Sequence, residues 1–136
     1  MKQTLLSTAC SLPLLLATPS YAQSSSPCPD AKVIQQVQLD NATMGEKGEY
    51  VAFKMLPEKI DGKSWYVAVG LIQTGDILSA LEMGRDIISQ TAAPVYPNIH
   101  QLSVAGHTFE GCMYQSNASD TAVYVVPAET DFLSKK

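Results

Sequence analysis

The sequence predicts a small α+β domain in which an antiparallel sheet of four to five strands, built from two hairpins, packs against two helices. Two β-rich blocks each follow a segment of helical periodicity, and alternating apolar residues within the blocks indicate strands with one buried face. The chain has 136 residues, of which 46% are hydrophobic, and a formal charge of −4. These values suit one globular domain.

The first helix is expected from Asp30 to about Leu39, because Val33, Ile34 and Val37 recur at a helical interval after a capping aspartate. Residues 41–48 contain two glycines and are expected to form a loop. Strands over 50–56 and 64–72 should pair as an antiparallel hairpin, since Asp61-Gly62 between them is a turn signal. The second strand should present Trp65, Val67, Val69 and Leu71 on one face and Tyr66, Ala68 and Gly70 on the other.

The second helix is expected from Asp76 to Gln90, with an apolar stripe that contains Ile77, Leu81, Gly84 and Ile88. Glycine costs a helix about 1 kcal/mol relative to alanine, so Gly84 on the stripe is expected to allow close approach to the sheet. Residues 91–98 hold two prolines and should be extended. Strands over 99–104, 107–115 and 121–126 complete the prediction, with a turn at Ala105-Gly106.

Residues 1–22 have the pattern of a signal peptide. Lys2 precedes an apolar run over residues 5–17, and Ser20-Tyr21-Ala22 places small residues before a cleavage point. Cys10 lies inside the apolar run rather than after it, which argues against a lipoprotein. The run is too short for a membrane span. We therefore expect a mature domain of residues 23–136 that is secreted or periplasmic.

Cys28 and Cys112 are the only cysteines left after this cleavage. An oxidising destination predicts that they form a disulfide. The bridge would close a loop of 85 residues. The chain-entropy model predicts a stabilisation of about 4 to 5 kcal/mol for a loop of this length. The alternative, a catalytic or metal-bound thiolate, lacks the C-x-x-C spacing such sites use.

The charge of the mature chain excludes one class of partner. Without Lys2 it has 8 basic and 13 acidic side chains, a formal charge of −5, and no run of Lys or Arg. Nucleic-acid binding and a polybasic membrane tether both require a basic surface.

Two N-glycosylation motifs, at Asn41 and Asn117, fall in predicted loops. They would matter only in a eukaryotic secretory route.

The two histidines are the candidate ligand residues. A two-residue turn at Ala105-Gly106 would pair Val104 with His107 and His100 with Gly111, which separates the imidazoles by roughly 13 Å at ~3.3 Å per pair step. That distance excludes direct binding of one zinc ion. One histidine, with Tyr96 in the spacing Y-x-x-x-H, would suit a haem iron. The ordinary alternative is that both histidines are surface residues of the strands.

The sequence holds no diagnostic catalytic spacing and no enzyme is predicted, although sequence alone leaves a Ser-His-Asp arrangement open. There is no G-x-S-x-G elbow and no glycine spacing typical of a phosphate loop. The aromatic strand residues are expected to be cross-strand core pairs rather than a stacking platform: Tyr50, Trp65, Tyr66, Tyr114 and Tyr124.

Four segments, together with the signal pattern, carry a resemblance: P-C-P-D-A at 27–31, S-W-Y-V-A-V-G at 64–70, D-I-L-S-A-L-E-M-G-R-D-I-I-S at 76–89 and F-E-G-C-M-Y at 109–114. The chain resembles a family of small exported proteins of intracellular gamma-proteobacteria, one member of which is described as the hemin-binding protein Hbp. The resemblance implies haem as a ligand and carries no ligand residue over to this chain. The sequence thus predicts a non-enzymatic binding protein, with haem favoured and a secreted protein–protein interaction module or host-directed factor as the alternative.

Overall fold

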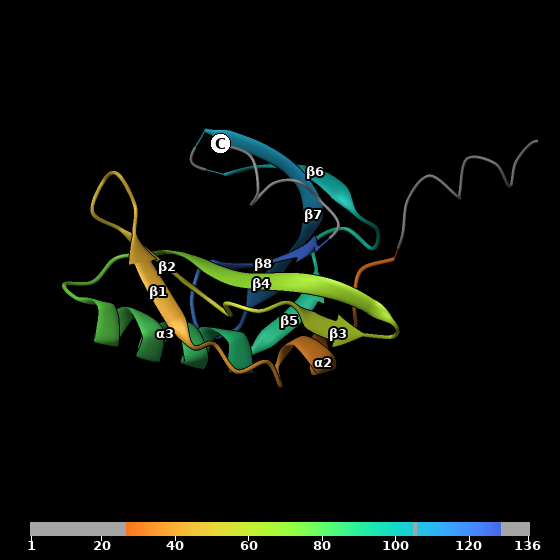
Figure 1. The fold of residues 1–136 in the computed structure, drawn as a ribbon, viewed down its shortest axis with the longest axis horizontal. Helices are drawn as coiled ribbons and strands as arrows, with labels where there is room; N and C mark the ends of the chain where they lie inside the picture. Colours follow the sequence, from red (N-terminus) through yellow and green to blue (C-terminus); the bar gives the residue numbers. More distant parts are fainter. Residues whose placement is uncertain (1–26, 105, 129–136) are drawn as a thin grey trace, which may run out of the picture.

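In the computed structural model of this chain, residues 27–104 and 106–128 are described, and they form one sheet with helices on one of its faces (Figure 1). The predicted signal peptide of residues 1–22, which contains Cys10, lies outside the described residues, as do residues 23–26, 105 and 129–136. The elements are α2 (Ala31–Ile34), β1 (Asn41–Met44), β2 (Tyr50–Phe53), β3 (Glu58–Ile60), β4 (Lys63–Ile72), α3 (Ile77–Ser89), β5 (Thr91–Pro94), β6 (His100–Val104), β7 (His107–Ser116) and β8 (Ala122–Pro127).

The strands run antiparallel in the order β1-β2-β4-β8-β7-β5, with β3 also paired to β4 and β6 also paired to β7. The α+β class with two helices is confirmed. The prediction of four to five strands is wrong, because the described residues form eight. The additional strands are β1, β3 and β5, each of three or four residues. Strands this short have no clear period of their own, and pairing with long neighbours such as β4 defines them.

The region around residues 31–44 differs most from the expectation. Asp30 caps α2 as predicted, accepting a hydrogen bond from the Lys32 backbone N–H at 3.2 Å, but the helix has only four residues. The Gln35 side chain donates to the Thr91 carbonyl at 2.7 Å, which ties the next residues to β5 instead of a second helical turn. Asn41, predicted in a loop, begins β1, whereas Asn117 is exposed outside the strands.

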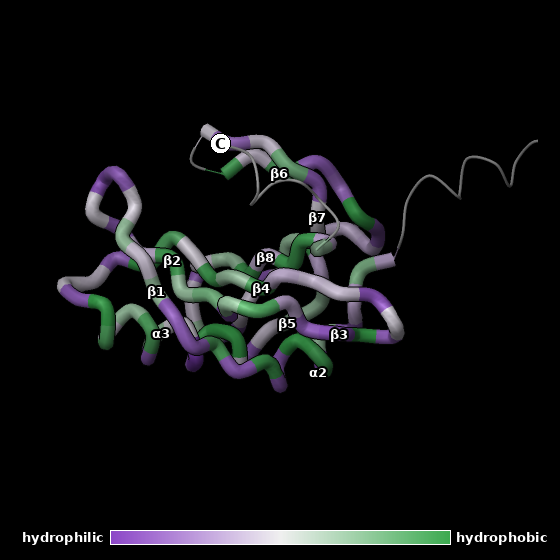
Figure 2. The backbone as a smooth tube through the Cα atoms, viewed as in Figure 1, coloured by the Kyte–Doolittle hydropathy of each residue, from purple (hydrophilic) through white to green (hydrophobic). Residues whose placement is uncertain are grey.

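The core lies between the helices and one face of the sheet. Figure 2 shows apolar segments in both helices and in the strands above them. In β4, Trp65, Val67 and Val69 are buried on this side. From α3, the residues buried against the sheet are Ala80, Gly84, Ile87 and Ile88. Ile77, predicted on the buried stripe, lies in the first turn and is 50% exposed.

Gly84 allows the close helix–sheet contact that the sequence predicts. A Cβ atom at this position would lie 2.6 Å from the Ala52 Cβ and 3.3 Å from Leu39 Cδ1. Real Cβ atoms do not approach that closely, so α3 would have to move away from β2. Close packing here therefore outweighs the weak helix propensity of glycine.

Gly84→Ala should lower the free energy of unfolding by a net amount of about 1 kcal/mol, because overpacking of about 1 to 3 kcal/mol exceeds the helix gain of about 1 kcal/mol. Urea denaturation measures the change. Gly75→Ala is the matched control, since a Cβ there meets nothing within 4 Å. A Gly84→Ala protein more stable than wild type would contradict the packing argument.

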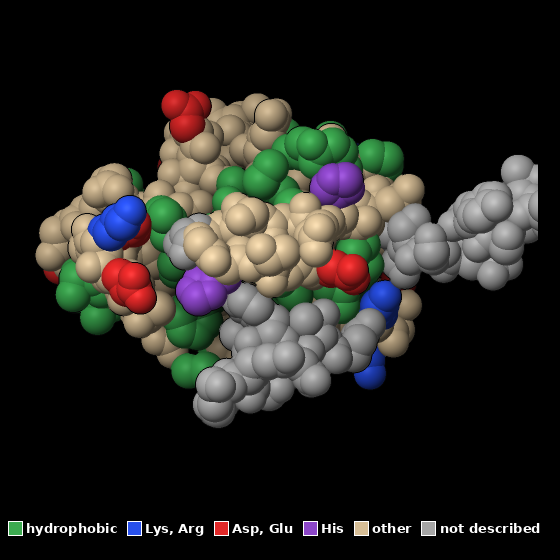
Figure 3. All heavy atoms as spheres, turned by 90° about the horizontal axis from the view of Figure 1, so that it is seen from above, with side chains coloured by type: hydrophobic (Ala, Val, Ile, Leu, Met, Phe, Trp, Pro, Cys, Tyr) green, Lys and Arg blue, Asp and Glu red, His purple; other side chains and the backbone are tan. Residues whose placement is uncertain are grey.

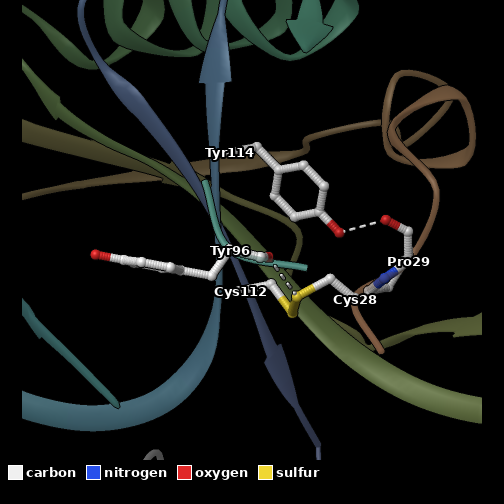
Figure 4. The surroundings of a disulfide bond; sticks show 5 residues. All are labelled: Cys28, Pro29, Tyr96, Cys112 and Tyr114. Carbon is white, nitrogen blue, oxygen red and sulfur yellow. Dashed lines mark hydrogen bonds between the residues drawn. A yellow bond between two sulfur atoms is a disulfide. The ribbon is translucent and has the colours of Figure 1, made fainter. Parts of the chain in front are cut away.

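The predicted disulfide is present. Cys28 and Cys112 are bonded, with their Cα atoms 5.9 Å apart, and the bridge joins the segment before α2 to β7 (Figure 4). Two further contacts hold that segment: the Cys28 backbone N–H donates to the Pro97 carbonyl at 2.9 Å, and the Tyr114 hydroxyl donates to the Pro29 carbonyl at 2.5 Å. The N-terminal end of the described chain is thus fixed to the sheet at several points.

Replacing both cysteines by alanine should lower the free energy of unfolding by about 4 to 5 kcal/mol, because the unfolded chain regains the entropy of the closed loop. Equilibrium denaturation of the oxidised protein and of the double variant gives the difference. A thiol reductant should destabilise the wild type and leave the variant unchanged. Equal stability of oxidised and reduced wild type would contradict a structural role for the bridge.

The Tyr114 hydroxyl is buried where its ionisation is unfavourable. Burial, with a smaller contribution from the Asp30 carboxylate, raises the pKa of Tyr114 well above its ordinary value of about 10. A group whose pKa is raised in the folded state contributes full stability below its unfolded pKa and loses it as the pH rises. The loss must therefore appear above about pH 10.

Tyr114→Phe should reduce this alkaline loss of stability, and at neutral pH it should cost about 1 kcal/mol for the hydrogen bond to Pro29. Unfolding curves between neutral pH and pH 11 test both effects. Tyr96→Phe removes a hydroxyl from an exposed ring and serves as the matched control. An unchanged alkaline profile in Tyr114→Phe would refute the assignment.

Candidate ligand-binding hollow

The sheet face opposite the helices carries apolar side chains rather than a polar surface. On β4, Tyr66, Ala68 and Gly70 lie on this face, as the alternation predicts. The prediction is wrong for Leu71, which also lies here, while Ile72 is buried in the core. Tyr50 pairs with Ile72 and Ala52 pairs with Val69, so β4 has one more residue than β2 between these two pairs. This β-bulge reverses the alternation of β4 beyond Gly70.

β7 rises from the sheet to form a roof above this face. Its residues Cys112, Met113 and Tyr114 pair with β8, whereas His107 to Gly111 pair with β6 in a separate ladder. At the junction, a Cβ on Gly111 would lie 2.8 Å from the Val125 carbonyl oxygen, so the close approach requires glycine. Figure 1 shows β7 curving upward here and the β6–β7 hairpin lying above β4 and β8.

A hollow of about 510 Å³ lies between the hairpin and the sheet. Its wall consists almost entirely of apolar atoms, and its volume falls in the range of small-molecule sites, about 300 to 1,000 Å³. The Phe109 ring of the hairpin meets the Tyr124 ring of β8 edge-on, with centroids 6.3 Å apart. The principal side chains come from β2 (Val51, Phe53), β4 (Tyr66, Ala68, Gly70), β8 (Tyr124, Val126) and the hairpin (Val104, His107, Phe109).

The structure separates the three predicted ligand residues. The predicted hairpin register is confirmed, since Val104 pairs with His107 and His100 with Gly111. His107 lines the hollow. His100 stacks on Tyr96 with ring centroids 4.1 Å apart, and both of these rings lie outside the hollow. Figure 3 shows apolar side chains at several places on this side of the molecule, and the two histidines well apart.

The polar side chains on the wall of the hollow include Tyr124 and His107. Burial raises the pKa of the Tyr124 phenol, so at neutral pH this group is a neutral hydrogen-bond donor or acceptor rather than a tyrosinate. Lys54, just after β2, also borders the hollow, but its ammonium group pairs with Glu58, Nζ to Oε1 at 3.7 Å. Glu58 pairs with Trp65, which is buried on the helix-covered face, so this charge lies away from the hollow. The hollow therefore combines apolar walls with neutral phenols and one imidazole.

The part of the chain that the structure describes holds no group of three or more His, Cys, Asp and Glu side chains placed to bind a metal ion. Within the same residues, no helix is long and apolar enough to cross a membrane.

Sequence reasoning missed Tyr66 and Tyr124 as lining residues. The two tyrosines were expected in the core, where Tyr50, Trp65 and Tyr114 are indeed buried. The sequence did hold one sign of the hollow. Ala68 and Gly70 are small residues on the β4 face opposite the core, and small side chains leave room above the sheet.

No family model matches the chain, and comparison with curated proteins and with solved structures finds no match. The chemistry of the hollow is therefore the guide to function.

Proposed function

We propose that the mature chain is an exported, non-enzymatic binding protein that holds a small, largely apolar ligand in this hollow, with haem as the favoured ligand. The observation that supports the proposal is the apolar hollow of about 510 Å³ with His107 on its wall. A large apolar concavity with a few convergent polar groups is the usual form of a ligand site.

The residues of the hollow suit a haem. A porphyrin is flat and mostly hydrocarbon, so it needs two apolar surfaces and an axial donor to its iron. The β4 face with Ala68 and Gly70 would form one surface, and Phe109 of the hairpin the other. His107 would supply the axial nitrogen. Tyr124 is a poor candidate for that role, since its raised pKa keeps it protonated.

Export and a non-enzymatic role complete the proposal. The Cys28–Cys112 disulfide is suited to an oxidising compartment, in agreement with the leader pattern of residues 1–22. Acid–base or nucleophilic catalysis needs a nucleophile and a base held together. Among the residues lining the hollow, His107 is the only imidazole and Thr43 supplies an aliphatic hydroxyl, but no carboxylate is among them. The sequence also holds no G-x-S-x-G elbow.

A second candidate, a protein–protein interaction module, draws on the first turn of α3. Leu78 is 79% exposed there beside the exposed Ile77. The two exposed side chains form a much smaller apolar surface than the core of a typical protein–protein interface. We therefore prefer ligand binding in the hollow to a role as an interaction module.

Hemin titrated into the oxidised mature chain should produce a shift of the Soret band. His107→Ala should weaken the binding by about tenfold or more, since the axial nitrogen is lost. His100→Ala is the matched control, because that histidine lies in the same hairpin but outside the hollow. Equal effects of the two variants would contradict the assignment of His107. Hemin binding no tighter than that of an unrelated acidic protein would favour the interaction module.

A further inference from the structure

On the sheet face opposite the helices, one small residue lies between two aromatic neighbours. Ala68 on β4 pairs with Phe53 on β2 and with Tyr124 on β8. Directly paired residues of an antiparallel sheet project to the same side, and all three line the hollow. Each is partly exposed, so a ligand can reach it. The methyl group of the alanine therefore leaves an open space that has an aromatic ring on each side.

The spacing of the two rings suits an aromatic ligand. Neighbouring strands lie about 4.8 Å apart, so two steps across the sheet separate the backbones of Phe53 and Tyr124 by roughly 10 Å. Aromatic pairs favour ring centroids about 4.5 to 7 Å apart. A third ring that contacts both neighbours at such distances needs roughly 9 to 14 Å between them. The separation across two strand steps falls within this range.

Both rings are held in place by the strands around them. Phe53 also pairs with Asn41 on β1, and Tyr124 also pairs with Met113 on β7, so each backbone has a partner strand on both sides. The Phe109 ring of the hairpin meets the Tyr124 ring at an interplanar angle of 74°. Because these side chains are already ordered, a ligand that contacts them loses little binding free energy to their immobilisation.

From this arrangement we infer that the hollow selects ligands with planar aromatic rings over aliphatic chains: a ring of the ligand occupies the space above Ala68, between Phe53 and Tyr124. An aliphatic chain of similar size would bury a comparable apolar area but would gain no aromatic pairing. The inference rests on the proposed function and deepens it by naming the ligand class. It does not depend on iron or on His107, and haem, a planar conjugated macrocycle, is one member of the class.

Two neutral ligands test the inference: N-phenylnaphthylamine, which is a fluorescent aromatic probe, and a straight-chain fatty alcohol of similar size, whose binding is measured by displacement of the probe. Tyr124→Leu should weaken the aromatic probe by about three- to tenfold, because the ring contact is lost while an apolar side chain remains. The fatty alcohol should bind this variant within about twofold of the wild type. Tyr124→Phe keeps the ring and should bind both ligands within about twofold of the wild type.

Tyr96→Leu is the matched control, since it removes an aromatic ring that lies outside the hollow. Phe53→Leu, on the other side of Ala68, should act as Tyr124→Leu does and provides the same test if that variant does not fold, which urea unfolding shows. The inference is overturned if the leucine variants weaken both ligands equally, or if they weaken the aromatic probe no more than Tyr96→Leu does.

Two further outcomes separate this inference from the proposed function. A wild type that binds neither neutral ligand would refute the hollow as a ligand site, and the inference with it. Hemin that fails to bind, while Tyr124→Leu still distinguishes the aromatic probe from the fatty alcohol, would refute haem as the ligand and leave the aromatic selectivity standing.

Discussion

β7 pairs with β8 through Cys112, Met113 and Tyr114 and with β6 through residues 107–111, so a single strand connects the sheet to the hairpin above it. The connection depends on backbone contact at Gly111, where a Cβ would lie 2.8 Å from the Val125 carbonyl oxygen. The next residue, Cys112, is bonded to Cys28. The point where the strand leaves the sheet is thus fixed by close packing on one side and by a covalent bond on the other.

The two faces of the sheet are both apolar but differ in what covers them. Below β4, the residues Trp65, Val67 and Val69 meet helices and are buried. Above it, smaller residues such as Ala68 and Gly70 face the hairpin across the hollow. An antiparallel sheet with one covered face normally presents polar side chains to water on the other. An apolar second face beneath the hairpin supports the proposed binding site, because exposed apolar surfaces of this kind commonly have a function.

The sequence predicted the elements whose signals are local. The capped helix α3, the long alternation of β4 up to Gly70, the β6–β7 register and the disulfide are all found in the structure. β1 and β3 were missed because three or four residues have no period, and pairing with β2 and β4 creates them. The hollow was missed for a different reason. Its roof depends on Gly111 meeting Val125, a contact between strands that no pattern within β7 encodes. Cross-strand pairing puts both histidines on one face of the hairpin, but at opposite ends of the ladder, so His107 lines the hollow and His100 stacks on Tyr96.

The central claim is that the space between the hairpin and the upper face of the sheet is the binding site. Gallium protoporphyrin is diamagnetic, so its contacts can be mapped by NMR on the isotope-labelled, oxidised mature protein. The claim predicts that the perturbed backbone amides cluster at Ala68, Phe109 and their neighbours around the hollow, while those around Leu78 on α3 remain unchanged. Perturbations centred on α3, with the signals of β4 and the hairpin unmoved, would contradict it.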